Sequence, residues 1–323
     1  MANYLVFGLG GIGAVHALAL HRAGKAVSAV ARSNIDSVKQ NGLTVKSGVW
    51  GDSTVQFADV YTSTSAQTSS GNARPIWDYV IVTTKALPNS SPSLPELLEP
   101  FITDEKTSIV LVQNGVGIED GVRARWPKNT ILSCVTWVGA TQVSPGVVEH
   151  PRGVKDEIGL FTSELDPAIE KPRLEALSSA FTAGGLDVEV VDNIQVRRWE
   201  KVIWNCAWNS LTALTNTNVL EWLTSSPEAE PLSREVMREV ITVAQALGLD
   251  IPFEFIDTLM DRAAGKALIS SMQVDAANHR PMETEVIVGY PLRKAQELGI
   301  QTPILRTLYA LLVAKEKKYS APA

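Results

Sequence analysis

The chain has 323 residues, of which 45% are hydrophobic and 20% charged, and its formal net charge is −6. This balance is typical of a folded globular protein and argues against a disordered chain. The negative charge disfavours binding to nucleic-acid phosphates, and two cysteines, Cys134 and Cys206, are too few for a disulfide framework or a zinc cluster. The sequence shows neither a signal peptide nor a bilayer-spanning apolar stretch, so we expect a cytoplasmic protein without a membrane partner.

The first part of the chain alternates short apolar runs with helix-like stretches. Continuous apolar runs are typical of buried parallel strands, and their alternation with helices predicts an α/β sheet. We expect strands at Tyr4–Phe7, Ala26–Ala31, Tyr79–Thr83, Ser108–Val112, Ile131–Val135, Gly159–Phe161 and Val188–Val191, and helices at Ile12–Ala23, Leu94–Leu98 and Pro172–Thr182. The polar segment Ser63–Pro75 has no periodicity and is predicted to be an exposed loop.

From about Asn193 onward the pattern predicts one helix after another. The expected helices are Val196–Leu214, Pro231–Leu247, Pro252–Ala267, Pro281–Leu298 with a kink at Pro291, and a last helix from Pro303 to about Lys318. This change of texture predicts two domains, with an all-α second domain.

The strongest local motif is a glycine-rich turn between the first strand and the first helix. It reads G-x-G-x-x-G and comprises Gly8, Leu9, Gly10, Gly11, Ile12 and Gly13. In such a motif Gly8 permits the tight turn, Gly10 lets the backbone approach a pyrophosphate, and Gly13 allows the helix to pack closely on the strand. The free N–H groups at the start of the helix also attract phosphate. The motif therefore predicts a dinucleotide site.

The end of the second strand indicates which dinucleotide binds. Arg32 stands where NAD enzymes usually place a carboxylate, and a guanidinium binds a 2′-phosphate that a carboxylate would repel. Ser33 and Asn34 can add hydrogen bonds, so we predict NADP(H); the alternative is that Arg32 is only a solvated residue. Lys85, after the third strand, either neutralises cofactor phosphate or is simply solvated.

A polar stripe marks the first helix of the second domain. Lys201, Asn205 and Asn209 are spaced i, i+4 and i+8, so they share one helix face among largely apolar residues. Because a buried polar stripe costs free energy unless it is paired, the stripe predicts a ligand site, although it could instead face water.

Two further polar clusters are ambiguous when taken alone. Asn114 follows the fourth strand in Gln113-Asn114-Gly115 and could simply cap the next helix. The run from Ser270 to Glu283 is more typical of a solvated loop between helices than of a site.

Together these motifs resemble the ketopantoate reductase (2-dehydropantoate 2-reductase) family. The matching pieces are GLGGIG, Arg32, TTK at Thr83–Lys85, QNG at Gln113–Gly115, W-x-K-x-x-x-N-x-x-x-N at Trp199–Asn209 and S-S-M-x-x-D-x-x-x-x-R-x-x-E at Ser270–Glu283. The resemblance implies a Rossmann-type NADP-binding domain at 1–192, a helical substrate and dimerisation domain at 193–323, and NADPH-dependent reduction of ketopantoate to pantoate. It implies catalytic roles for Lys201 and Glu283, substrate contacts for Asn114, Asn205, Asn209 and Ser271, and a cofactor contact for Asn114.

The chemistry of these residues agrees with such a reduction. An ammonium group stabilises the negative charge that develops on the ketone oxygen and can deliver the proton, and Lys201 is the candidate on the stripe. Ser271 can donate to the substrate carboxylate, while Glu283 can hold a substrate hydroxyl and keep Lys201 protonated. No metal is expected, because His16, His21, His150 and His279 have no ligand spacing.

Two other functions stay open at this point. The same chemistry could act on another branched or aryl 2-keto acid, because Trp204 and Trp208 make the helix bulky and would favour apolar substrates. An NADPH-binding regulatory module would need the glycine turn and Arg32 but neither the stripe nor Glu283. The apolar surface of the later helices could pair two chains, and Asn218 is a weak further candidate for the site.

Overall fold

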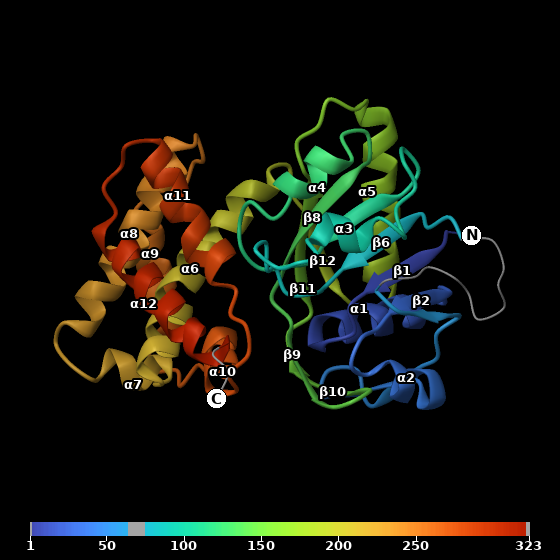
Figure 1. Cartoon of the computed structure of the whole chain (residues 1–323), viewed down its shortest axis with the longest axis horizontal. Helices are drawn as coiled ribbons and strands as arrows, with labels where there is room; N and C mark the ends of the chain where they lie inside the picture. Colours follow the sequence, from blue (N-terminus) through green and yellow to red (C-terminus); the bar gives the residue numbers. More distant parts are fainter. Residues whose placement is uncertain (1, 64–74, 321–323) are drawn as a thin grey trace. The chain divides into compact units, whose positions relative to one another are not determined.

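The computed structural model describes residues 2–63 and 75–320, which form two compact units. The first comprises Met1–Lys85, Ser90–Gln113 and Ile118–Ile194, and the second Ala86–Asn89, Asn114–Gly117 and Gln195–Ala323. The predicted fold class is confirmed, with a Rossmann-type α/β first unit and a second unit that is largely helical (Figure 1). Most of the loop expected at Ser63–Pro75 lies outside the described residues.

The first unit is built on an eight-stranded sheet with the order β12-β11-β8-β7-β6-β1-β2-β5. Its strands are β1 (Tyr4–Phe7), β2 (Val27–Val30), β5 (Val60–Tyr61), β6 (Tyr79–Val82), β7 (Ser108–Leu111), β8 (Ile131–Thr136), β11 (Lys155–Leu160) and β12 (Asp187–Val190). The six neighbouring strands β8, β7, β6, β1, β2 and β5 run parallel, whereas β11 pairs antiparallel with β8. The chain order reverses between β1 and β6, and sheets of this type bind ligands at the carboxyl ends of the strands at such a point.

A second, four-stranded sheet was missed by the sequence analysis. Its order is β4-β3-β10-β9, with β3 (Leu43–Ser47), β4 (Ser53–Val55), β9 (Gly139–Ser144) and β10 (Val147–Arg152). Helix α1 (Gly11–Arg22) is buried continuously from Gly13 to Leu20, and it shares one apolar core with strands of both sheets. A helix that is apolar on all sides needs neighbours all round, and the second sheet supplies them on one side of α1.

The other helices of the first unit begin where local chemistry favours a start. They are α2 (Ile35–Asn41), α3 (Leu94–Leu98), α4 (Asp120–Arg125) and α5 (Pro167–Ala183). Helix α5 begins earlier than expected because Asp166 caps it, accepting from the Ala168 amide at 2.8 Å, and Pro167 occupies the first helical position. Pro172 therefore lies inside this helix and does not begin it.

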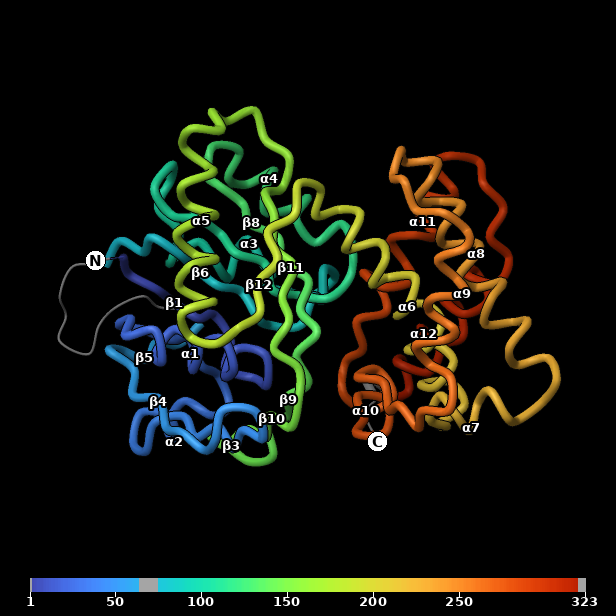
Figure 2. Tube along the Cα trace, turned by 180° about the vertical axis from the view of Figure 1, so that it is seen from behind, coloured from blue at the N-terminus to red at the C-terminus, as the bar shows by residue number. Residues whose placement is uncertain are grey.

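The second unit is a bundle of helices, seen in the yellow-to-red part of the trace (Figure 2). Its helices are α6 (Ile194–Thr215), α7 (Val219–Leu223), α8 (Ala229–Ala246), α9 (Phe255–Ala263), α10 (Ser271–Ala277), α11 (Tyr290–Glu297) and α12 (Pro303–Ser320). The start of α12 is held to α8 because the Glu239 carboxylate accepts from the amides of Ile304 and Leu305, at 3.0 and 2.8 Å. None of the helices within residues 2–63 and 75–320 has the length and apolar character needed to cross a membrane.

The helix expected over Pro281–Leu298 is present, but it begins at Thr284 and its first part is widened into a one-turn π-helix, η1 (Glu285–Gly289). This turn runs without a break into α11, and Pro291 lies just after it. The preceding run is also more ordered than a loop, because Ser270 caps α10 by accepting from the Gln273 amide at 3.0 Å. Glu283 lies just before the π-turn.

Candidate functional site

The glycine turn has the geometry that its sequence predicts. Gly8 has a φ of +106°, a left-handed value that favours glycine, and the Thr83 hydroxyl donates to its carbonyl oxygen at 2.6 Å. A Cβ on Gly13 would lie 1.9 Å from that same oxygen, so α1 can approach β1 this closely only with glycine there. These contacts place the start of α1 at the carboxyl ends of β1 and β6.

The turn also leaves an open face that fits a dinucleotide. A Cβ on Gly10 would meet no atom within 4 Å, whereas one on Gly11 would lie 2.2 Å from the Ala140 carbonyl oxygen on β9. In the part of the chain that the structure describes, no side chain caps the start of α1, so its first amide groups are available to a ligand. Open space beside uncapped amides is what a pyrophosphate requires.

The residues expected to contact cofactor phosphate divide into two groups. Arg32 and Ser33 are exposed just beyond the end of β2, and Lys85 is exposed just beyond β6. Asn34 does not join them, because it is buried and donates to the Leu9 carbonyl oxygen at 3.0 Å. Its carboxamide therefore braces the glycine turn, which corrects the expectation of a phosphate contact.

In the second unit, the segment Asn114–Gly117 is packed tightly through its glycines. Gly115 and Gly117 have φ values of +91° and +72°. A Cβ on Gly115 would lie 2.4 Å from the Val286 Cβ, and one on Gly117 would lie 1.9 Å from the Tyr290 ring. The Val116 amide also donates to the Val286 carbonyl oxygen at 3.0 Å. The segment is thus fixed against η1 and α11, and Asn114 does not cap a helix, since α4 begins only at Asp120.

This packing brings Asn114 between Lys201 and Glu283. The Lys201 ammonium donates to Asn114 Oδ1 at 2.9 Å, and Asn114 Nδ2 donates to Glu283 Oε2 at 2.8 Å. An ammonium only donates and a carboxylate only accepts, so the two partners fix which way the carboxamide points. The other carboxylate oxygen, Glu283 Oε1, accepts from the Ala86 amide at 3.0 Å. An ammonium group and a buried carboxylate are thereby held on one carboxamide.

The remaining residues of the stripe are also buried. Asn205 and Asn209 are 6% and 4% exposed, and within the described residues Asn209 Nδ2 donates to no acceptor. Such a buried donor costs about 1–3 kcal/mol unless a ligand satisfies it. Ser271 is exposed at the start of α10, next to Ser270, whose hydroxyl lies 2.7 Å from that of Thr212 on α6. The start of α10 therefore lies beside the C-terminal half of the stripe.

The sequence analysis missed two contributors and overvalued a third. Arg198 is 2% exposed and donates to the Gly115 carbonyl oxygen at 3.0 Å; its position three residues before Lys201 places it on the same helix face but does not indicate that it is buried. The Ala86 amide is a backbone group and leaves no trace in the sequence. Asn218 caps α7, accepting from the Glu221 amide at 3.0 Å, which accounts for it without a ligand.

Trp204 and Trp208 pack against each other beside the stripe. Their ring centroids are 5.8 Å apart in an edge-to-face arrangement, and the Arg262 guanidinium lies 5.3 Å from the Trp204 ring centroid. Trp208 is 1% exposed, whereas Trp204 is only half-buried. Trp204 therefore adds apolar surface next to the polar groups of α6, and the buried Trp208 packs behind it.

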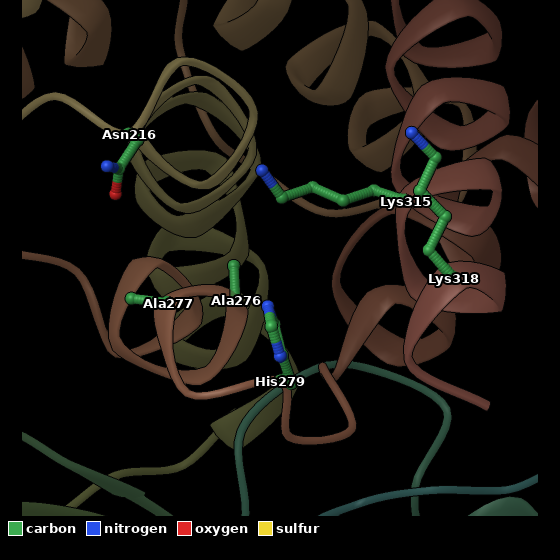
Figure 3. A pocket seen from close by; sticks show the side chains of 6 residues that line it. All are labelled: Asn216, Ala276, Ala277, His279, Lys315 and Lys318. Carbon is green, nitrogen blue, oxygen red and sulfur yellow. The ribbon is translucent and has the colours of Figure 1, made fainter. Parts of the chain in front are cut away.

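A separate hollow of about 330 Å³ lies in the helical unit, lined by Asn216, Ala276, Ala277, His279, Lys315 and Lys318. Figure 3 shows that its polar side chains do not converge. The Lys315 side chain extends toward the end of α6, the Lys318 ammonium points in another direction, and the Asn216 carboxamide points away from both. The side chains that line the hollow thus differ from Lys201 and Glu283, which both bond to the Asn114 carboxamide.

A Rossmann-type sheet with a glycine turn at its switch point, together with a helical unit that carries a lysine–asparagine–glutamate network, defines a nicotinamide-dependent oxidoreductase. Residues 4–163 match the family model described as ketopantoate reductase PanE/ApbA, and residues 193–316 match the model of that family's C-terminal region. The chain therefore belongs to the ketopantoate reductase family, as its motifs predicted. It is an NADP(H)-dependent oxidoreductase of the class that acts on CH–OH groups.

Individual relatives match over nearly the whole chain. A 2-dehydropantoate 2-reductase from Nostoc sp. is 30% identical over 308 residues, which cover 95% of this chain and 93% of that protein. The crystal structure of 2-dehydropantoate 2-reductase from Methylococcus capsulatus has a TM-score of 0.87 at 30% identity and covers 99% of this chain and 98% of that one. A ternary structure of D-mandelate dehydrogenase with NADH and anilino(oxo)acetate shares the fold, with a TM-score of 0.84 at 22% identity and coverage of 99% and 100%.

Proposed function

We propose that this protein reduces 2-dehydropantoate to pantoate, using NADPH as the hydride donor and Lys201 as the general acid. The observation that carries the proposal is the hydrogen-bonded series from Lys201 through Asn114 to Glu283. The names of the relatives from Nostoc sp. and Methylococcus capsulatus support the choice of substrate. The residues of the glycine turn, Arg32 and Lys85 are the proposed cofactor contacts, together with Asn114.

Bound NADPH supplies the hydride that reduces the C2 carbonyl of the substrate. The negative charge that this places on the carbonyl oxygen is stabilised by the Lys201 ammonium, which then donates a proton to give the C2 hydroxyl. Asn114 keeps the ammonium oriented by accepting one of its N–H groups. Glu283 favours the protonated form of Lys201 through the same carboxamide and can also accept from the terminal hydroxyl of the substrate.

The rest of the stripe is assigned to substrate binding. The unpaired Asn209 Nδ2 donates to a substrate oxygen, which removes the cost of burying it, and Asn205 lies one helical turn away on the same face. Ser271 donates to the substrate carboxylate from the exposed start of α10. Because the amides and hydroxyl carry no net charge, they orient the substrate without opposing the positive charge on Lys201.

A second candidate is the same reduction on another branched or aryl 2-keto acid. The observation that favours it is the pair Trp204 and Trp208 beside the stripe, and the fold shared with D-mandelate dehydrogenase is consistent with it. A role as an NADPH-binding regulatory module is less favoured, because it leaves the buried network around Asn114 unexplained. Any keto-acid turnover eliminates the regulatory module.

The test is NADPH oxidation by the purified protein, followed by absorbance with 2-dehydropantoate, 2-ketoisovalerate and phenylglyoxylate, and repeated with NADH. We expect the highest kcat/KM with 2-dehydropantoate and NADPH. A site built to bond the terminal hydroxyl should reject 2-ketoisovalerate, which lacks it, by about 10⁴-fold or more. Preference for phenylglyoxylate would select the second candidate, and no turnover of any of the three would refute both.

The proposal also includes the cellular location of the protein, which is the cytoplasm, and its oligomeric state. Cys134 and Cys206 are both buried free thiols, which suits the reducing cytoplasm. Leu247, Phe253, Leu298 and Leu311 are exposed on the helical unit, and we propose that the protein forms a homodimer through this unit. Light scattering after size-exclusion chromatography should give twice the mass of one chain, and the single-chain mass would contradict the dimer.

A further inference from the structure

A buried arginine near the start of α6 has no role in the chemistry described so far. Arg198 is 2% exposed, and its Nη1 donates to the Gly115 carbonyl oxygen at 3.0 Å. Burying a guanidinium is costly unless hydrogen bonds compensate, so an arginine at this depth requires a structural or functional reason. Its partner is the carbonyl of the residue that directly follows Asn114.

We propose that Arg198 is a positioning residue that fixes the backbone of Asn114–Gly117, so that Asn114 can join Lys201 to Glu283. The inference rests on the proposed function, because it assigns Arg198 to the same reduction. Arg198 lies three residues before Lys201, so the two side chains leave neighbouring positions on one face of α6. Both reach the same short segment, Lys201 through the Asn114 side chain and Arg198 through the Gly115 backbone.

Packing on η1 and α11 holds the segment from one side, and Arg198 supplies a hydrogen bond from α6. Gly115 and Gly117 have left-handed φ values, and glycine is the residue that gives a chain the most freedom to move. The Val116 amide holds the far side of the segment by donating to Val286 in η1 at 3.0 Å. Arg198 holds the opposite side, at the Gly115 carbonyl. Releasing one side should let Asn114 shift relative to both of its partners.

Helix α6 also fixes the π-turn that precedes α11. The buried Cys206 thiol donates to the Ile287 carbonyl oxygen at 2.8 Å, and a helix that widens into a π-turn commonly does so at a functional site. Helix α6 therefore contacts both segments that carry the partners of Lys201. It bonds to the Asn114–Gly117 segment through Arg198, and to η1, which follows Glu283, through Cys206. Arg198 contributes the directional contact, since the planar guanidinium presents its N–H donors in a fixed geometry.

The decisive variant is Arg198→Met, which keeps an apolar stem of similar bulk and removes every donor. We expect kcat to fall about 100-fold, because small displacements of a catalytic group have effects of this size, while KM for NADPH stays within about twofold. The matched control is Arg197→Met at the neighbouring position, where the arginine pairs with Glu200 on the helix surface. It should leave kcat unchanged. Wild-type kcat in a folded Arg198→Met variant would overturn the proposal.

A double-mutant cycle separates positioning from a general loss of structure. If Arg198 acts through Asn114, the variant that combines Arg198→Met with Asn114→Ala should be no slower than Asn114→Ala alone, within about threefold. Effects that multiply would show that the two residues act independently, and would overturn the proposal. If Arg198→Met does not fold, Arg198→Gln replaces it in the cycle, because its shorter side chain cannot reach the Gly115 carbonyl.

Hydrogen exchange tests the inference without any substrate. In Arg198→Met or Arg198→Gln, amides of residues 115–117 should exchange about tenfold faster than in wild type, and in Arg197→Met they should not. Unchanged exchange would overturn the proposal even if kcat falls. If the wild-type protein reduces none of the keto acids, the proposed function fails, and the exchange rates alone then decide whether Arg198 fixes this segment.

Discussion

The Lys201 ammonium donates to Asn114 Oδ1 at 2.9 Å, although the two residues are separated by 87 positions in the sequence. The contact forms because Asn114 sits on a two-glycine segment that packs on η1, while Lys201 lies on the polar face of α6. Asn114 also donates to Glu283, so its carboxamide separates a cation from an anion and bonds to both. The carboxamide of Asn114 thus couples the proposed general acid to the carboxylate through two hydrogen bonds.

Replacing Lys201 tests the proposed proton donor. Lys201→Ala should lower kcat by about 10²- to 10⁴-fold, the usual contribution of a general acid, while the affinity for NADPH stays unchanged. The measurement is steady-state kinetics together with NADPH titration by fluorescence. Lys317→Ala, which removes an exposed lysine from α12, serves as the control. Turnover close to wild type in Lys201→Ala would contradict the assigned role.

The bridging role of Asn114 predicts an unusual pH response for Asn114→Asp. The new carboxylate can still accept from Lys201, but it faces Glu283, and repulsion between two carboxylates raises the pKa of the pair. We expect kcat to fall about 10- to 100-fold at neutral pH and to recover partly as the pH is lowered, once the pair shares a proton. Asn114→Ala loses both contacts and should show no such recovery. Equal pH profiles for the two variants would argue against the bridge.

Much of this site could be predicted from the sequence because its signals are local. The glycine turn has fixed spacing, and Lys201, Asn205 and Asn209 repeat with the period of a helix. The four-stranded sheet was missed because strands such as β9 and β10 are polar and only partly buried, so they lack the apolar runs of the main sheet. The Ala86 amide could not be predicted, since a backbone donor has no residue type to recognise it by.

The structure also shows one expectation that failed, for Asn34, and one contact that was not expected, for Arg198. Asn34 follows Arg32 closely, so proximity suggested a shared phosphate, but its carboxamide is buried against Leu9. Arg198 belongs to the polar face of α6, but arginine is usually exposed, so its burial against Gly115 could not be read from the sequence alone. In both cases a long-range contact decides what a local pattern leaves open.

Substituting two different glycines of the turn should affect protein stability in one case and cofactor binding in the other. Gly13→Ala places a Cβ 1.9 Å from a backbone oxygen, so it should lower the free energy of unfolding by about 1–3 kcal/mol or more. Gly10→Ala meets no atom within 4 Å, and its φ of −81° suits alanine, so stability should be kept while NADPH affinity falls. Urea denaturation and NADPH titration check both variants. Unchanged NADPH affinity in Gly10→Ala would place the pyrophosphate elsewhere.

Arg32 should decide between the two nicotinamide cofactors. Its exposed guanidinium stands just beyond β2, and a charge-assisted hydrogen bond contributes about 1.5–3 kcal/mol. Arg32→Asp should therefore raise KM for NADPH by at least about 10- to 100-fold and change KM for NADH little. Lys39→Asp makes the same charge change at an exposed site on α2 and is the control. Equal losses with both cofactors would show that Arg32 does not bind the 2′-phosphate.

A buried histidine in α1, His16, should make the stability of the protein depend on pH. His16 Nε2 lies 2.8 Å from the Asp156 carboxylate, and His16 Nδ1 lies 2.8 Å from the Ile12 carbonyl oxygen, with both side chains fully buried. Burial alone would lower the pKa of His16, but the charge of Asp156 and these hydrogen bonds outweigh it and raise the pKa above its usual value. Two acceptors on the two ring nitrogens fit the imidazolium form.

The sign of the effect follows from this raised pKa. Protonated His16 contributes its full stabilisation below the unfolded-state pKa of about 6.5, and the contribution is lost as the pH rises through the higher folded-state pKa. The free energy of unfolding, measured with urea across this range, should therefore decrease with rising pH. Asp156→Asn should lower stability most at the acidic end and flatten this slope, whereas His21→Gln, at an exposed position of the same helix, should leave it intact. A slope that survives in Asp156→Asn would assign the pH dependence to other groups.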